Sequence, residues 1–312
     1  MPCAMEAELQ MPLPSPFPPE IRTIGLFAPA GVPEPARLAR GMARLREWGL
    51  ELVYPGANDP RERFLAGSDA LRLRRLHELL ANPRVDALLA VRGGYGCARL
   101  LDGIDWDRLR ERNLPLIGYS DLTALHLAAY GHGCRRGVFG PMVVSDFGRE
   151  PANPDEETAL AGSLTSCHAV LTGAAQTFTG LACLRPGETT GPLVPANLSV
   201  LASLVGTPHL PDLSGVILVL EDVRESAYRI DRYLLQLDQG GVLGRVSGLV
   251  FAQFSQTEDV EWLPGVLADY AGRVAGPVAA GLDFGHAFPS VSLPVGQPGH
   301  LRASPTASVL GT

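Results

Sequence analysis

The sequence predicts an α/β fold in which an N-terminal parallel-sheet domain is followed by a smaller C-terminal β/α domain. Short β-rich runs alternate with helical patterns along most of the chain, which is typical of parallel βαβ units covered on both faces. With 312 residues, of which 46% are hydrophobic, the chain can bury two cores. Small, polar and proline residues dominate 151–178, which predicts a linker between the domains.

The N-terminal domain is predicted to span 21–150, after a proline-rich flexible tail at 1–20. Leu38, Met42 and Leu45 recur on one face of the first helix, and Ser68 is placed as the N-cap of the second. The predicted strands are 21–29, 50–56, 85–96 and 114–120, and the predicted helices are 34–49, 69–82 and 121–133.

The C-terminal domain is predicted to span 179–312. Its strongest strand is the apolar run "GVILVLED" at 215–222, and glycine closes the helix "YRIDRYLLQLDQGG". The remaining predicted helices are 197–208 and one near 259–273, and the remaining predicted strands are 246–254 and 276–281.

Composition excludes several classes of protein. A net charge of −7 without any block of like charges predicts neither a nucleic-acid nor an anionic-membrane partner. No run approaches the roughly 18 apolar residues of a membrane-spanning helix. The five cysteines form no CxxC pair, so we expect no disulfide framework, no metal site and a cytoplasmic protein. Lysine is absent, which excludes lysine-based chemistry, and no cofactor is expected.

Ser120 stands in "GYSD", between a predicted strand and a predicted helix. A serine hydroxyl is a good nucleophile only when a base removes its proton and donors stabilise the oxyanion. A sharp strand-to-helix turn exposes the hydroxyl and directs the first helical N–H groups toward it. Ser120 is therefore a candidate nucleophile and the Asp121 N–H a candidate oxyanion donor. Alternatively, either residue simply caps the helix, and Leu122, where GxSxG has glycine, disfavours a standard α/β-hydrolase.

The stretch "RGGYG" at 92–96 follows the preceding predicted strand. Adjacent glycines let the backbone turn its N–H groups toward a bound group. A Gly-Gly pair is by itself often only a turn. Next to an elbow serine, however, Gly93 or Gly94 becomes a candidate for the second oxyanion donor.

A base and an acid that orients it complete the hypothesis. His286 is the candidate base, because it alone of the seven histidines follows a predicted strand in a glycine-containing loop. The simpler interpretation is a loop histidine that faces solvent. Glu221 ends a very hydrophobic strand, and a buried carboxylate there needs a partner such as an imidazole N–H. Asp222, Glu225 and Asp231 are competing acids nearby.

Together, "FLAGSD", "RGGYG", "GYSDLTAL", "LEDVRESAYRIDRYLLQL" and "GLDFGHAFPSVSLPVG" resemble the LD-carboxypeptidase family of serine peptidases. This family includes muramoyltetrapeptide carboxypeptidases and microcin C immunity hydrolases. The resemblance runs from about residue 21 to residue 300. It implies an N-terminal domain like that of class I glutamine amidotransferases, a swivelling C-terminal domain and a homodimer.

The resemblance also implies a Ser–Glu–His triad of Ser120, Glu221 and His286, with oxyanion donors at the backbone N–H groups of Asp121 and of a glycine in "RGGYG", which we assign to Gly94. The implied reaction is hydrolysis of an L,D-peptide bond that releases terminal D-Ala from murein tetrapeptides. Because an exopeptidase recognises a free carboxylate, Arg92 and Arg232 are candidate substrate-binding residues.

Two alternatives stay open. A microcin-immunity-like hydrolase would act on acyl-sulfamate or aminoacyl-nucleotide amides and would need an aromatic side chain to stack a nucleobase. Trp262 is the only tryptophan in the C-terminal half, and no inserted aromatic loop is evident. A catalytically silent binding module would leave a fluorophosphonate probe unreacted.

The chain also departs from the family at "PANL" (195–198), where a glycine pair is usual, and at Pro289, where asparagine is common.

Overall fold

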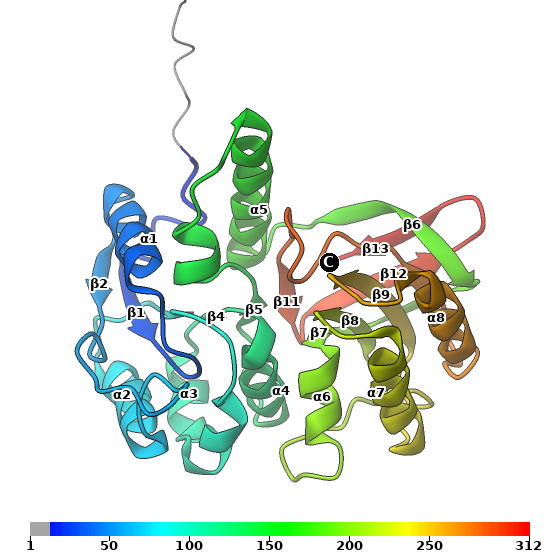
Figure 1. Ribbon diagram of the computed structural model, residues 1–312, viewed down its shortest axis with the longest axis horizontal. Coiled ribbons are helices and arrows are strands. Elements are labelled where there is room, and N and C mark those ends of the chain that lie inside the picture. Colours follow the sequence, from blue (N-terminus) through cyan, green and yellow to red (C-terminus); the bar gives the residue numbers. More distant parts are fainter. Residues whose placement is uncertain (1–12) are drawn as a thin grey trace, which may run out of the picture.

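The computed structural model describes residues 13–312, which form two domains side by side (Figure 1). The N-terminal domain contains a six-stranded sheet, and the C-terminal domain contains a closed barrel of seven strands. The predicted α/β class and the presence of a second sheet domain are therefore confirmed.

The N-terminal sheet has the strand order β11-β5-β4-β3-β1-β2, and only β11 runs antiparallel to its neighbour. Its strands are β1 (Thr23–Phe27), β2 (Glu51–Val53), β3 (Ala87–Ala90), β4 (Leu116–Ile117), β5 (Gly137–Phe139) and β11 (Leu293–Val295). Its helical segments are α1 (Pro35–Glu47), α2 (Asp69–Ala81), η1 (Cys97–Gly103), α3 (Trp106–Arg112), η2 (Ser120–Leu122), α4 (Thr123–Gly131), η3 (Val143–Phe147) and α5 (Pro154–Thr172). Because β3 and β4 are parallel neighbours, the segments that follow them emerge together at one sheet edge.

The barrel closes in the order β10-β6-β13-β12-β7-β8-β9. Its strands are β6 (Thr177–Arg185), β7 (Gly187–Asn197), β8 (Ile217–Val223), β9 (Gly248–Ser255), β10 (Val278–Ala280), β12 (Pro298–Ala303) and β13 (Ser308–Gly311). Its helical segments are α6 (Leu198–Leu204), α7 (Ala227–Gln239), η4 (Val260–Trp262) and α8 (Leu263–Ala271). The strands β7 to β10 are parallel, so the carboxyl ends of β7 and β8 lie together.

The prediction of a linker at 151–178 is wrong for most of its length, because α5 occupies residues 154–172. The Asn153 side chain caps this helix by accepting a hydrogen bond from the Glu156 N–H, and Pro154 takes the first helical position. Leu160 and Leu164 pack into the N-terminal core. The many small residues along 154–172 dilute the apolar periodicity that would have identified the helix.

The predicted flexible tail is too long at its C-terminal end. Residues 1–12 lie outside the described part of the chain, but residues 13–20 are packed against the domain. Phe17 is 7% exposed and its ring lies 6.0 Å from that of Phe147, centroid to centroid. The Trp48 indole N–H donates to the carbonyl oxygen of Leu13 at 3.0 Å.

The chain crosses between the domains a second time after β10. It leaves the barrel, passes through residues 281–292 and joins the N-terminal sheet as β11. Two serines of α5 hold this crossing segment. The backbone N–H of Ser290 donates to the Ser163 hydroxyl at 3.2 Å, and that of Ser292 donates to the Ser166 hydroxyl at 2.9 Å. The predicted loop that carries His286 therefore touches both domains.

Candidate active site

Ser120 occupies a sharp turn between β4 and α4. Its φ of +66° lies in the left-handed region, which is unusual for a residue with a side chain. Gly118 makes the turn feasible, since a Cβ there would come within 2.5 Å of Leu122 Cδ2 and 2.9 Å of Ala90 Cβ. Ser120 makes no capping hydrogen bond to the helix. The geometry is that of a half-buried serine at a strand-to-helix elbow rather than of a helix cap.

Gly93 lies directly against Ser120. A Cβ at Gly93 would come within 2.9 Å of Ser120 Cβ and 3.1 Å of Ser120 Oγ, so only glycine fits without a shift. Gly94 has a φ of +118°, in the region that glycine tolerates. The predicted meeting of the "RGGYG" loop with the elbow serine is therefore seen in the structure.

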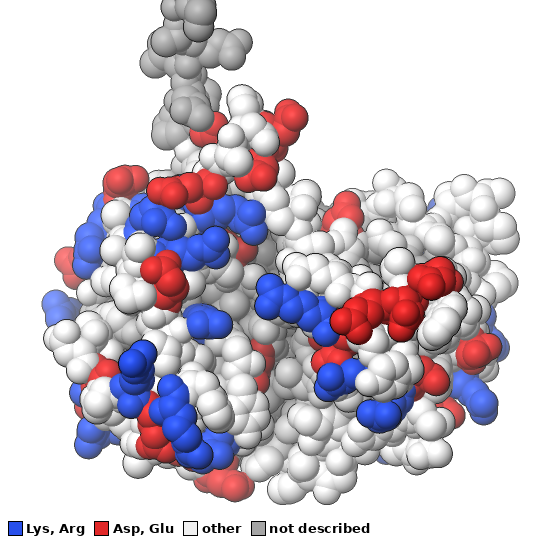
Figure 2. Space-filling view, viewed as in Figure 1, with Lys and Arg blue, Asp and Glu red and all other residues white. Residues whose placement is uncertain are grey.

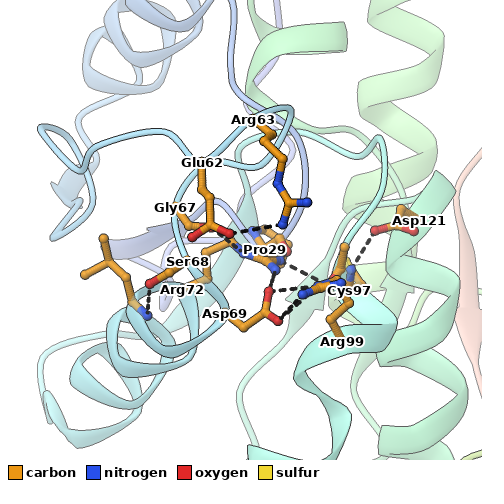
Figure 3. A network of polar contacts seen from close by, with 12 residues as sticks. Pro29, Glu62, Arg63, Gly67, Ser68, Asp69, Arg72, Cys97, Arg99 and Asp121 are labelled. Atoms are coloured by element: carbon orange, nitrogen blue, oxygen red, sulfur yellow. Dashed lines mark hydrogen bonds and ion pairs between the residues drawn. The ribbon is translucent and has the colours of Figure 1, made fainter.

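A polar network fixes this glycine loop (Figure 3). The Asp121 carboxylate accepts a hydrogen bond from the Cys97 N–H at 2.8 Å, which joins the serine turn to the end of the loop. The buried guanidinium of Arg72 donates to the carbonyl oxygens of Pro29, Gly67 and Gly96. Asp69 pairs with Arg72 and also with Arg99, so two arginines share one carboxylate.

His286 bridges the two domains by hydrogen bonds from both ring nitrogens. Its Nε2 lies 2.9 Å from Ser120 Oγ, and its Nδ1 lies 2.7 Å from Glu221 Oε2. The backbone N–H of His286 donates to the same carboxylate oxygen at 3.2 Å. Gly285 permits this approach, since a Cβ there would come within 2.4 Å of Glu221 Oε2. A carboxylate on Nδ1 favours the tautomer in which Nε2 can accept the serine proton.

Glu221 lies near the end of β8 and is fully buried. The Asn197 side-chain amide, at the end of β7, donates to Glu221 Oε1 at 3.1 Å and to Asp222 Oδ1 at 2.9 Å. Burial raises the pKa of Glu221, and the hydrogen bond from His286 opposes this shift. Burial by itself would lower the pKa of His286, but the hydrogen bond and charge of Glu221, together with the charges of Asp222 and Asp146, raise the pKa above its usual 6.5.

The competing acids have other partners. Asp222 accepts hydrogen bonds from Asn197 and from the backbone of Ser199, and Asp231 accepts one from the Tyr270 hydroxyl at 2.6 Å. Glu225 forms an ion pair with Arg229. The remaining histidines bond or stack elsewhere: His77, His126, His132, His168, His209 and His300.

The two predicted substrate-binding arginines lie in different places. Arg92 belongs to the glycine loop and donates to the carbonyl oxygen of Val32 at 2.6 Å. Arg232 lies on the exposed side of α7, where its guanidinium carbon is 5.4 Å from the Tyr228 ring centroid. No hydrogen bond or ion pair within residues 13–312 joins Arg232 to Ser120, His286 or Glu221.

Sequence reasoning missed several side chains around this site. These are Asn197 within "PANL" and Arg72 within "FLAGSDALR". Asp146 and Tyr119 also border His286, whose ring centroid lies 5.1 Å from that of Tyr119. A buried polar residue at the end of a strand, as Asn197 is, was the available signal.

The face drawn in Figure 2 has a furrow between the two domains, and charges of both signs are mixed around it.

No cluster of three or more His, Cys, Asp or Glu side chains in the described part could hold a metal ion. Cys97, Cys134, Cys167 and Cys183 are free thiols, and Cys3 lies outside the described residues. None of the helices in residues 13–312 has the length and hydropathy needed to cross a membrane.

Comparisons with known proteins match both domains of the chain to one family. Residues 24–139 match the LD-carboxypeptidase N-terminal domain, and residues 190–301 match the LD-carboxypeptidase C-terminal domain. The chain is 33% identical to the "Probable murein peptide carboxypeptidase" of Bacillus subtilis, over 92% of this chain and 91% of the relative. It is 27% identical to the microcin C7 self-immunity protein MccF of Escherichia coli, over 88% of each chain.

The fold agrees as well. The crystal structure of muramoyltetrapeptide carboxypeptidase from Oxalobacter formigenes superimposes with a TM-score of 0.83 and 32% sequence identity, and covers 93% of this chain and 98% of that one. Matches to both domains in their order along the chain, together with identity above 30% over most of the length, establish the relationship. The chain belongs to the LD-carboxypeptidase family.

Proposed function

We propose that this protein is a serine carboxypeptidase that hydrolyses an L,D-peptide bond and releases the terminal D-Ala of murein tetrapeptides. The observation that carries the proposal is the hydrogen-bonded chain from Ser120 Oγ through His286 to Glu221, with distances of 2.9 and 2.7 Å. The names of the relatives, a murein peptide and a muramoyltetrapeptide carboxypeptidase, support the choice of substrate class.

In the first half-reaction, Ser120 Oγ attacks the scissile carbonyl carbon while His286 Nε2 takes the hydroxyl proton. The oxyanion is held by the backbone N–H groups of Asp121 and of the glycine loop, for which Gly94 is our assignment and Gly93 the immediate neighbour of the hydroxyl. His286 then gives the proton to the departing nitrogen as the C–N bond breaks, which frees the D-amino acid.

In the second half-reaction, water replaces the amine. His286 removes a proton from the water as its oxygen attacks the acyl carbon, and returns that proton to Ser120 Oγ as the ester bond breaks. The products are the shortened peptide with a free carboxylate and the unchanged enzyme. Glu221 stabilises the imidazolium that forms in each step and keeps the ring oriented.

The remaining expectations stay predictions. They are the likeness of the N-terminal domain to class I glutamine amidotransferases, swivelling of the C-terminal domain, a homodimer and a cytoplasmic location. For swivelling, the structure offers a constraint, because one buried apolar cluster contains both Leu125 of α4 and Leu201 of α6. The backbone N–H of Asn197 also donates to the Thr123 hydroxyl at 2.9 Å across the same interface.

The second candidate function is hydrolysis of an acyl-sulfamate or aminoacyl-nucleotide amide, which the similarity to MccF favours. Trp262, the only tryptophan of the C-terminal half, is 59% exposed on η4. It contributes no ring contact to the described site. The peptide reaction is therefore the better supported of the two.

Purified protein incubated with murein tetrapeptide is expected to release D-Ala only, as followed by mass spectrometry. The Ser120→Ala variant should lose about six orders of magnitude in kcat, because it removes the hydroxyl that is hydrogen-bonded to His286 Nε2. Ser203→Ala, an exposed serine on α6, serves as the matched control and should retain full activity. Turnover of an aminoacyl sulfamate alone would transfer the assignment to the second candidate.

The pH profile is expected to report His286. Protonated imidazole cannot accept the serine proton, so kcat/KM should fall as pH drops through this pKa, with a midpoint above 6.5. In Glu221→Gln burial remains while the carboxylate is gone, so the midpoint should move to lower pH and kcat should fall by about 10³ to 10⁴-fold. Asp231→Asn should change neither the midpoint of the pH profile nor kcat. An unchanged midpoint in Glu221→Gln would refute this role of Glu221.

Arg72 is expected to act by positioning the glycine loop. Arg72→Met frees the carbonyl oxygens of Pro29, Gly67 and Gly96, so kcat should fall by about 10 to 100-fold while KM changes little. Arg75 on the same helix pairs with Asp59 and Glu78 but does not touch the loop. Arg75→Met should leave kcat unchanged. Equal losses of kcat in the two variants at equal thermal stability would contradict the positioning role.

A further inference from the structure

An exopeptidase of the proposed kind needs a cation for the free carboxylate of its substrate. That carboxylate belongs to the leaving D-amino acid, in which only two bonds, about 2.5 Å across, separate the departing nitrogen from the carboxyl carbon. The departing nitrogen must reach His286 Nε2 to receive its proton. The cation is therefore expected beside the loop that carries His286, rather than beside the glycine loop.

Arg149 meets this condition. It follows η3, and its guanidinium carbon lies 4.1 Å from the ring centroid of Phe288, two residues beyond His286. The Nε of Arg149 is buried and has no hydrogen-bond partner in the described part of the chain. A buried donor without an acceptor is costly, so this nitrogen needs an acceptor that the described chain does not supply.

The surroundings of Arg149 overlap those of His286. Burial raises the pKa of both Asp146 and Tyr119, and the charge of Arg149 opposes this shift in each, so its guanidinium lies within electrostatic range of both side chains. Tyr119 packs edge-on against the His286 ring at 5.1 Å. Asp146 does not use Arg149 as a hydrogen-bond donor, because its Oδ2 accepts from the Met142 N–H and the Ser145 hydroxyl.

The two arginines predicted from the sequence are less suited to this task. Arg92 lies on the glycine-loop side of Ser120, and one of its terminal nitrogens is already bonded to Val32 O. Arg232 is exposed on α7 over Tyr228. Arg149 also stacks on a ring, but this ring is Phe288 in the loop that carries His286, and stacking leaves the in-plane N–H groups available for bidentate recognition of a carboxylate.

We propose that Arg149 binds the free carboxylate of the departing D-amino acid and so makes the enzyme selective for chain ends. This inference rests on the proposed function. Phe288 holds the guanidinium plane beside the His286 loop, so the side chain that recognises the leaving group and the imidazole that protonates it belong to one packed unit.

The test compares murein tetrapeptide that ends in D-Ala with the same peptide that ends in D-alaninamide. Wild type should cleave the free acid with the higher kcat/KM. In Arg149→Met the kcat/KM for the acid should fall by about 10 to 100-fold while that for the amide stays unchanged, so the preference disappears. Arg149→Lys should recover part of the preference. Arg135→Met is the matched control, because Arg135 also stacks on a ring, that of Tyr130, at 4.8 Å.

Other results would overturn the proposal. An equal loss on both peptides in Arg149→Met would mean that the side chain only supports the His286 loop. Loss of the acid preference in Arg92→Met, with the preference intact in Arg149→Met, would assign the carboxylate to Arg92. Cleavage of neither peptide by wild type would show that the proposed function itself is wrong, and the role of Arg149 would fall with it.

Discussion

The hydrogen bond between His286 Nε2 and Ser120 Oγ depends on the placement of both domains, because each domain supplies part of the chain of contacts. Ser120 belongs to the turn after β4, Glu221 to the barrel strand β8, and His286 to the segment that crosses from β10 to β11. That segment is held by serines of α5, and β11 ends it as an edge strand of the first sheet. A shift of one domain against the other would therefore break the chain of hydrogen bonds from Ser120 through His286 to Glu221.

A fully buried carboxylate beside an imidazole is costly unless its lone pairs are satisfied. Here Glu221 accepts from the ring and backbone of His286 and from the Asn197 side chain. Asn197 also binds Asp222, so one amide organises two neighbouring acids. The parallel register that places Asn197 opposite Glu221 at the ends of β7 and β8 produces this arrangement without long loops. The strand pairing that builds the barrel therefore also places the donor that the buried Glu221 carboxylate needs.

Sequence patterns predicted the α/β class and identified Ser120, Glu221 and His286 as candidate site residues. They could do so because strand ends, glycine loops and charged residues after apolar runs are local signals. Other parts depend on tertiary contacts. The helix α5 was missed because small residues dilute its apolar face, and β11 because a three-residue strand near the C-terminus pairs with the N-terminal sheet. Arg72 and Asn197 were not predicted, because their roles depend on hydrogen-bond partners that the local sequence does not show. Arg72 binds backbone carbonyls distant in sequence, and Asn197 binds a carboxylate on the neighbouring strand.

Peptide mapping after reaction with a fluorophosphonate probe tests the central claim most directly, because the probe reports an activated serine whatever the natural substrate is. The account predicts a single adduct on Ser120 in wild type, no adduct in Ser120→Ala and strongly slowed labelling in His286→Ala, while the folded state is retained. A protein that stays unlabelled, or one in which the adduct forms on Ser120 at the same rate without His286, would contradict it.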